Sequence, residues 1–114
     1  MRRALPALVA VTLLCACGDS SDEVAAPAPD PTGSARSACD ALAEQWPQEV
    51  LGAPLLQTTP PSPYTAAWGD PAIVATCGVP TPAERLADAQ LFEVDGVTWF
   101  AQELTNGTRF TSEE

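Results

Sequence analysis

The sequence contains neither histidine nor lysine, and five arginines carry all of its positive side-chain charge. Histidine-based acid–base catalysis, lysine Schiff-base chemistry and serine–histidine hydrolysis are therefore excluded by composition. The 15 carboxylates give a net charge of −10. A chain this acidic lacks the basic surface with which proteins hold phosphate backbones. We expect no nucleic-acid partner.

The amino-terminal segment is typical of an exported lipoprotein. Two arginines precede an uncharged apolar stretch, residues 4–14, which is shorter than the ~20 residues that a membrane-spanning helix needs. It ends in Leu14-Cys15-Ala16-Cys17, which resembles a bacterial lipobox. We predict a signal peptide over 1–16, with a lipid on Cys17 that holds the mature chain on the outer face of the cytoplasmic membrane. A cleaved signal without lipid and a Cys-x-Cys metal or redox site are the alternatives.

Removal of the signal leaves a strongly acidic chain. Its 98 residues would carry three arginines and fifteen carboxylates, a net charge of −12. Anionic lipid head groups would not attract such a chain, so the acyl chains would provide the attachment. Residues 17–36 are rich in Pro, Ala, Ser and acids, which predicts a disordered, lipidated tether. The folded domain is expected over residues 37–114.

The first half of that domain shows one helical pattern. Cys39, Leu42, Ala43 and Trp46 lie at helical spacing and predict a helix over about 38–46. Ser37 and Asp40 are placed as a capping box at its start, and Pro47 disfavours helix beyond it. Residues 47–66 contain five prolines and are expected to be mostly irregular.

The second half shows mainly strand patterns. The apolar run 72–77 predicts a buried strand, and Thr81-Pro82 predicts a short helix that ends near residue 88. Asp95-Gly96 predicts a hairpin between 91–94 and 97–102. Asn106-Gly107 predicts a second reversal. The expected class is α+β: a small disulfide-bridged domain with one short N-terminal helix packed on a 3–4-stranded, mainly antiparallel sheet.

Two cysteines, Cys39 and Cys77, lie outside the signal. An even pair in an exported domain predicts a disulfide, which in the disputed chain-entropy model would contribute about 4 kcal/mol for a loop of this length. The alternative, a catalytic thiol, needs a neighbouring base to form the thiolate. Because histidine and lysine are absent, the structural role is preferred.

Three blocks of sequence resemble the DUF3515 family, a domain of unknown function. The most specific block runs from Trp68-Gly69-Asp70-Pro71 to Cys77-Gly78. The others are Cys39 with the following short helix and proline, and Val94-Asp95-Gly96-Val97-Thr98-Trp99 with Arg109-Phe110-Thr111. The resemblance implies a small exported or membrane-associated protein of high-GC Gram-positive bacteria, with no established activity. Such proteins usually continue past the last block with another β-rich segment, so the resemblance also implies a lost terminal strand or a fragment.

Two hypotheses for function remain. The first is an envelope binding or accessory module that recruits a protein or wall polymer. Tyr64, Trp68 and Asp70 would form its binding surface, whereas Trp46 and Trp99 fit a core role better. The second is a hydrolase of cell-wall glycan that uses two carboxylates, for which the candidates are Asp70, Glu93, Asp95 and Glu103. We expect no enzyme activity, no cofactor and no metal site.

The lipid prediction is tested by the mass of the intact mature protein. We expect a chain that starts at Cys17 and carries the additional mass of acyl groups. A chain that starts at residue 17 or 18 without added mass would contradict the anchor.

Overall fold

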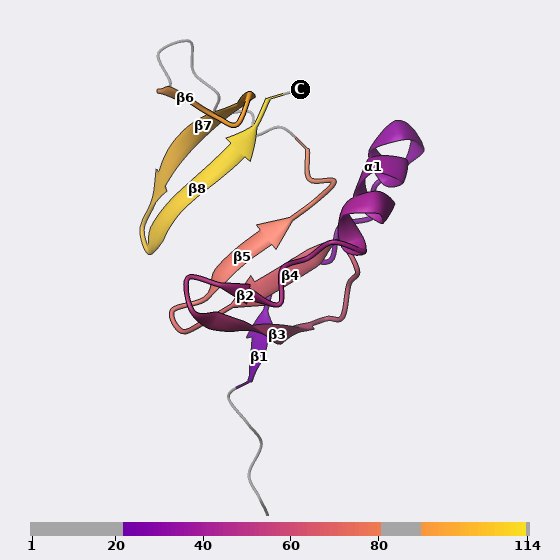
Figure 1. Cartoon of the computed structure of the whole chain (residues 1–114), viewed down its shortest axis with the longest axis vertical. Coiled ribbons are helices and arrows are strands. Elements are labelled where there is room, and N and C mark those ends of the chain that lie inside the picture. Colours follow the sequence, from indigo (N-terminus) through magenta and orange to yellow (C-terminus); the bar gives the residue numbers. More distant parts are fainter. Residues whose placement is uncertain (1–21, 81–89, 114) are drawn as a thin grey trace, which may run out of the picture.

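The computed structural model describes residues 22–80 and 90–113, and these residues form one helix and two β-sheets (Figure 1). The helix is α1 (Gly33–Ala43). The larger sheet contains β1 (Glu23–Ala25), β2 (Glu49–Val50), β3 (Ala53–Thr59), β4 (Thr65–Trp68) and β5 (Ile73–Thr76). The smaller sheet contains β6 (Leu91–Val94), β7 (Val97–Leu104) and β8 (Gly107–Ser112). The α+β class is confirmed, but the prediction of a single sheet with 3–4 strands is wrong.

The core of the larger sheet is built around β4. The sheet has the order β1-β3-β4-β5, with β2 paired to β3. All four residues of β4 are buried, and Trp68 retains only 3% of its surface. The predicted strand at 72–77 is present as β5, but its first residues, Ile73 and Val74, are exposed. The prediction of a buried strand there is wrong because β5 lies at one end of the sheet order and β4 fills the centre.

Prolines border the strands of residues 47–66 without preventing them. This segment was expected to be mostly irregular, yet it contains β2, β3 and the start of β4. Pro54 is the second residue of β3 and pairs with Glu49 of β2. The β-prone residues 55–59 continue that strand until Pro60 ends it. The prolines of this segment therefore do not prevent strand formation, and one of them directly follows the end of β3.

Helix α1 begins earlier than the capping pattern predicts. Its first backbone bond runs from Arg36 N–H to the Thr32 carbonyl, and Thr32 is the N-cap residue without a side-chain cap bond. Ser37 therefore lies inside the helix. Alanine and arginine have high helix propensity, which favours helix over 33–38 despite the tether-like composition. The helix ends at Ala43, before the predicted residue 46, and a tighter bond of 2.8 Å from Gln45 N–H to the Leu42 carbonyl closes its last turn.

Residues 22–32 also differ from the expected disordered tether. β1 pairs in parallel with β3, from Glu23↔Gln57 to Ala25↔Thr59. The Thr65 hydroxyl then donates a hydrogen bond of 2.6 Å to the Pro27 carbonyl. Further along, Pro31 is buried against Gly78, where an added Cβ would lie 2.6 Å from the proline ring. This segment is therefore fixed to the larger sheet along most of its length.

The predicted disulfide between Cys39 and Cys77 is present. Cys39 is the buried residue of α1, and its sulfur is bonded to that of Cys77, which follows β5. The tyrosine hydroxyl of Tyr64 donates a second link, a 2.6 Å hydrogen bond to the Asp40 carboxylate of the same helix. Together these two contacts hold α1 beside the sheet (Figure 1).

The smaller sheet forms as the turn patterns predict. β6 and β7 join through Asp95-Gly96, both with positive φ as a tight hairpin requires, and β8 follows the second reversal. One face buries Phe100 almost completely. The opposite face exposes Phe92 and Phe110, whose rings meet edge to face at 6.5 Å. The helix predicted over 81–88 lies outside the described residues.

The disulfide is expected to supply a large part of the stability. Replacing both cysteines by alanine should lower the free energy of unfolding by about 4 kcal/mol, because the bridge closes a 38-residue span of chain. Urea denaturation measures this change. Reduction of the native protein should give a similar loss, and an unchanged midpoint after complete reduction would contradict the prediction.

Candidate functional site

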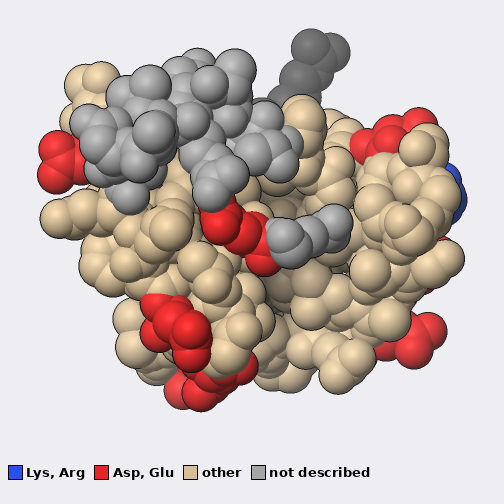
Figure 2. All heavy atoms as spheres, turned by 90° about the horizontal axis from the view of Figure 1, so that it is seen from above, with Lys and Arg blue, Asp and Glu red and all other residues tan. Residues whose placement is uncertain are grey.

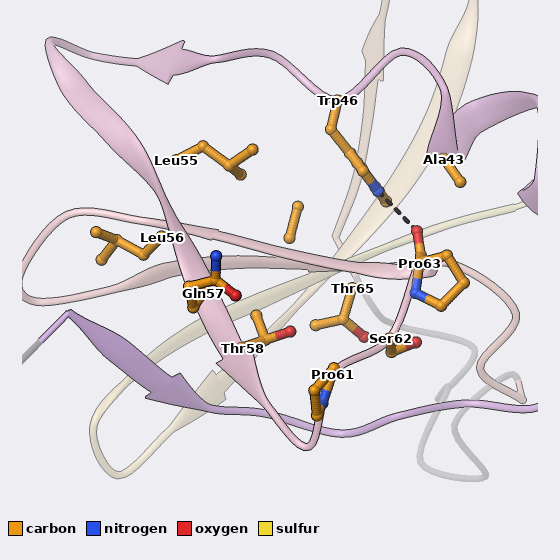
Figure 3. Close-up of a pocket in the computed structure, with 11 residues that line it drawn as sticks. Ala43, Trp46, Leu55, Leu56, Gln57, Thr58, Pro61, Ser62, Pro63 and Thr65 are labelled. Carbon is orange, nitrogen blue, oxygen red and sulfur yellow. Dashed lines mark hydrogen bonds between the residues drawn. The ribbon is translucent and has the colours of Figure 1, made fainter.

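An open groove of about 390 Å³ lies where β3 and β4 diverge. Its walls are residues 55–58 of β3, 65 and 66 of β4, and the proline-rich loop 61–63. Ala43 at the end of α1 and the following Trp46 complete it (Figure 3). Every side chain that lines the groove is uncharged. We call this feature the Trp46 groove.

The groove exposes an unpaired stretch of strand. The ladder between β3 and β4 consists of Leu55↔Trp68 and Leu56↔Ala67. If it continued, Thr58 and Thr65 would be the next hydrogen-bonded pair. Four consecutive residues of β3 line the groove, although successive side chains point to opposite faces of a sheet. The wall is therefore the backbone edge of β3 as well as its side chains.

Trp46 has a fixed position in this groove. Its indole N–H donates a 2.9 Å hydrogen bond to the Pro63 carbonyl (Figure 3), and its ring meets that of Trp68 edge to face at 6.2 Å. Trp68 is fixed in turn, because its indole N–H donates to the Pro47 carbonyl at 2.9 Å. Trp46 stays half-buried. Because the hydrogen bond to Pro63 and the contact with Trp68 both orient this half-buried ring, it offers a preorganised apolar contact surface.

The structure corrects the predicted binding surface of Tyr64, Trp68 and Asp70. Tyr64 and Trp68 retain only 6% and 3% of their surface, so neither is available for a ligand. They are buried because β4 and its flanking residues form the centre of the larger sheet. Asp70 is exposed in the turn between β4 and β5. The aromatic residue at a surface cavity is Trp46, which the sequence pattern had favoured for the core.

Tyr64 forms a local electrostatic network with α1. The hydrogen bond from its hydroxyl to Asp40, followed by burial of the phenol, raises the pKa of Tyr64 above its ordinary value of 10.0. The Arg36 guanidinium, 6.0 Å from the centre of the ring, opposes this effect on the pKa. Arg36 also pairs with Asp30 at 3.4 Å. These contacts bind the helix to the sheet and leave the phenol inaccessible.

The four candidate carboxylates do not meet in the groove. Asp70 and Asp95 lie in turns of different sheets. Glu93 and Glu103 both lie in the smaller sheet, but their side chains are on opposite faces of it. Figure 2 shows acidic side chains at several separate points on the face seen from above. Within the described chain, no group of three His, Cys, Asp or Glu residues is placed to hold a metal ion.

The predicted anchor residue, Cys17, lies outside the described residues. In the described ranges 22–80 and 90–113, α1 is too short to cross a membrane.

A comparison with protein families gives a match over almost the whole chain. Residues 2–112 match the family described as "Protein of unknown function (DUF3515)". The chain belongs to the DUF3515 family. The resemblance based on the Trp-Gly-Asp-Pro to Cys-Gly block is thereby confirmed. No curated protein and no solved structure matches the chain.

Only some of the groove residues could be recognised from the sequence. Trp46 stands out as an aromatic residue before a proline, and Pro60-Pro61-Ser62-Pro63 marks a rigid loop. The missing information is the end of the β3–β4 ladder, because pairing between strands depends on register. The β-prone residues 55–59 are the one local signal for the strand that forms one wall of the groove.

The Tyr64 contact predicts a measurable titration. Tyr64 is the only tyrosine, so tyrosinate absorbance reports this residue alone, and its midpoint should lie above 10.0. Asp40→Ala removes the carboxylate that accepts the hydrogen bond and should shift the midpoint toward 10.0. A native midpoint at or below 10.0 would contradict the contact.

The same shift in pKa sets the direction of the pH dependence of stability. The raised folded-state pKa favours the neutral phenol, so its stabilising effect is complete below pH 10.0 and is lost as pH rises through the folded-state value. Tyr64→Phe should remove this part of the alkaline loss, as measured by urea denaturation over a pH series.

Proposed function

We propose that this DUF3515 member is a lipid-anchored binding or accessory module of the bacterial cell envelope. The lipid on Cys17 would hold it at the outer face of the cytoplasmic membrane, and the Trp46 groove would bind its partner. The lipobox-like sequence before Cys17 supports the location. The observation that carries the binding role is the groove, an open cavity of about 390 Å³ with uncharged walls and a fixed aromatic residue.

The chemistry of the groove favours binding over catalysis. General acid–base catalysis needs a titratable group within reach of the reacting atom, and the groove walls contain none. They offer the Trp46 ring, the Gln57 amide and the Thr58 hydroxyl. Apolar walls with a few placed polar groups are common in ligand sites.

The alternative, a carboxylate hydrolase of wall glycan, has less support. Such enzymes place two carboxylates roughly 5–10 Å apart across one cleft. The candidate acids of this chain occupy turns and opposite sheet faces in two different sheets. No described acid lines the groove.

Site-specific photocrosslinking in the producing cells tests the binding role. A photoreactive phenylalanine analogue at Pro61, which is exposed and lines the groove, should capture an envelope protein or wall polymer. The matched control position is Leu51, which is 94% exposed and does not line the groove.

The groove variant Trp46→Ala should strongly reduce capture from position 61. Its urea midpoint is measured in parallel, because the loss of a half-buried ring also costs stability. Equal products from positions 51 and 61, or capture that survives the loss of Trp46 in a folded variant, would overturn the assignment of the groove as the binding site.

A further inference from the structure

The backbone geometry of the Trp46 groove identifies the class of ligand that it fits. We infer that the groove binds an extended, uncharged or basic peptide segment of an envelope protein, which adds to the free edge of β3 beside Thr58. This inference rests on the proposed binding function and specifies its ligand.

The backbone N–H and carbonyl of Thr58 point away from β1. Ala26 N–H donates a 3.1 Å hydrogen bond to the Thr59 carbonyl, so the polar groups of Thr59 face β1. Adjacent residues of a strand direct these groups to opposite edges. The N–H and carbonyl of Thr58 therefore face β4.

β4 does not pair with the backbone groups of Thr58. The Cys77 N–H donates to the Tyr64 carbonyl, so Tyr64 faces β5 and its neighbour Thr65 faces β3. Thr58 and Thr65 thus face each other, yet the ladder ends one hydrogen-bonded pair earlier, at Leu56↔Ala67. Within the described chain, neither backbone edge has a strand partner at this point. An unpaired strand edge is a template for an added peptide.

The charge and shape of the Trp46 groove favour a neutral or basic peptide. The groove walls carry no charge, whereas the predicted mature chain has a net charge of −12. An acidic peptide would be repelled, and a neutral or basic one would not. Trp46 and the proline loop would contact its apolar side chains, in the manner of grooves that recognise proline-containing segments. A neutral glycan could stack on the Trp46 ring, and its hydroxyls could meet single backbone groups, but it lacks the amide spacing of a paired strand.

Two variants of Thr58 separate the backbone N–H from the side-chain hydroxyl. Thr58→Pro removes the N–H. Thr58 pairs with Val24 in the ladder of β3 with β1, but its N–H points toward β4, beyond the last pair of the ladder between β3 and β4. The substitution therefore removes no ladder hydrogen bond, and the sheet should tolerate it. Thr58→Val removes the hydroxyl and keeps the N–H. Recovery of the disulfide and an unchanged near-ultraviolet circular dichroism spectrum confirm that each variant is folded.

Binding is measured on the mature chain in detergent, with a display library of short random peptides as the probe. Selected peptides should be uncharged or basic. Thr58→Pro should weaken the selected peptide about tenfold, the scale of one lost hydrogen bond of about 1.4 kcal/mol, and Thr58→Val should not. N-methylation of alternate peptide amides should weaken binding in only one of the two registers.

A second arm uses chitotetraose as a neutral sugar probe. If the sugar binds, if its binding depends on Trp46 and if no peptide is selected, the peptide inference is overturned while the groove remains a binding site. If neither probe binds and crosslinking from position 61 also fails, the proposed function falls with it. Equal affinity of the Thr58→Pro and native chains for the selected peptide would also overturn the inference.

Discussion

The bond between Cys39 and Cys77 is the constraint on which the rest of the larger sheet depends. It fixes α1 to the end of β5, so that the Asp40 carboxylate meets the Tyr64 hydroxyl and the chain leaving the helix passes over Trp68. Trp46 then reaches the Pro63 carbonyl across the sheet. Because a helix of 11 residues is marginal without tertiary contacts, the covalent link stabilises the element that places the groove's aromatic wall.

The groove follows from a mismatch between neighbouring strands. β3 has seven residues and pairs along different parts of its length with β2, β4 and β1. β4 has four residues and is fully paired with β5. The proline loop after β3 separates the two strands before their ladder can extend to Thr58 and Thr65. The unpaired backbone groups of Thr58 and Thr65 therefore lie beside the Trp46 groove.

The sequence predicted the local features of this fold and missed those that depend on distant contacts. Asp95-Gly96 specifies its hairpin through the positive φ values of the turn. The Cys39–Cys77 bond was predicted because two cysteines lie outside the predicted signal and the chain has no histidine or lysine to act as a base. The strand at 53–59 was missed because Pro54 and the prolines on either side of the strand were interpreted as a sign of irregular structure. The burial of Tyr64 and Trp68 depends on the central place of β4, which no local pattern reveals. Trp46 was recognised as an aromatic residue of the helix face, but its exposure depends on where α1 ends.

The attachment of residues 22–32 to the larger sheet has a mechanical consequence. A pull on the amino-terminal end would load the three residue pairs of β1 and β3 in shear and then the Thr65 and Gly78 contacts. Unravelling from that end can proceed only as far as Cys39, where the disulfide carries the tension to Cys77. The strands β2 to β5 lie within this covalent loop. They are therefore protected from being peeled away, and the groove keeps its shape while the amino-terminal chain is under load.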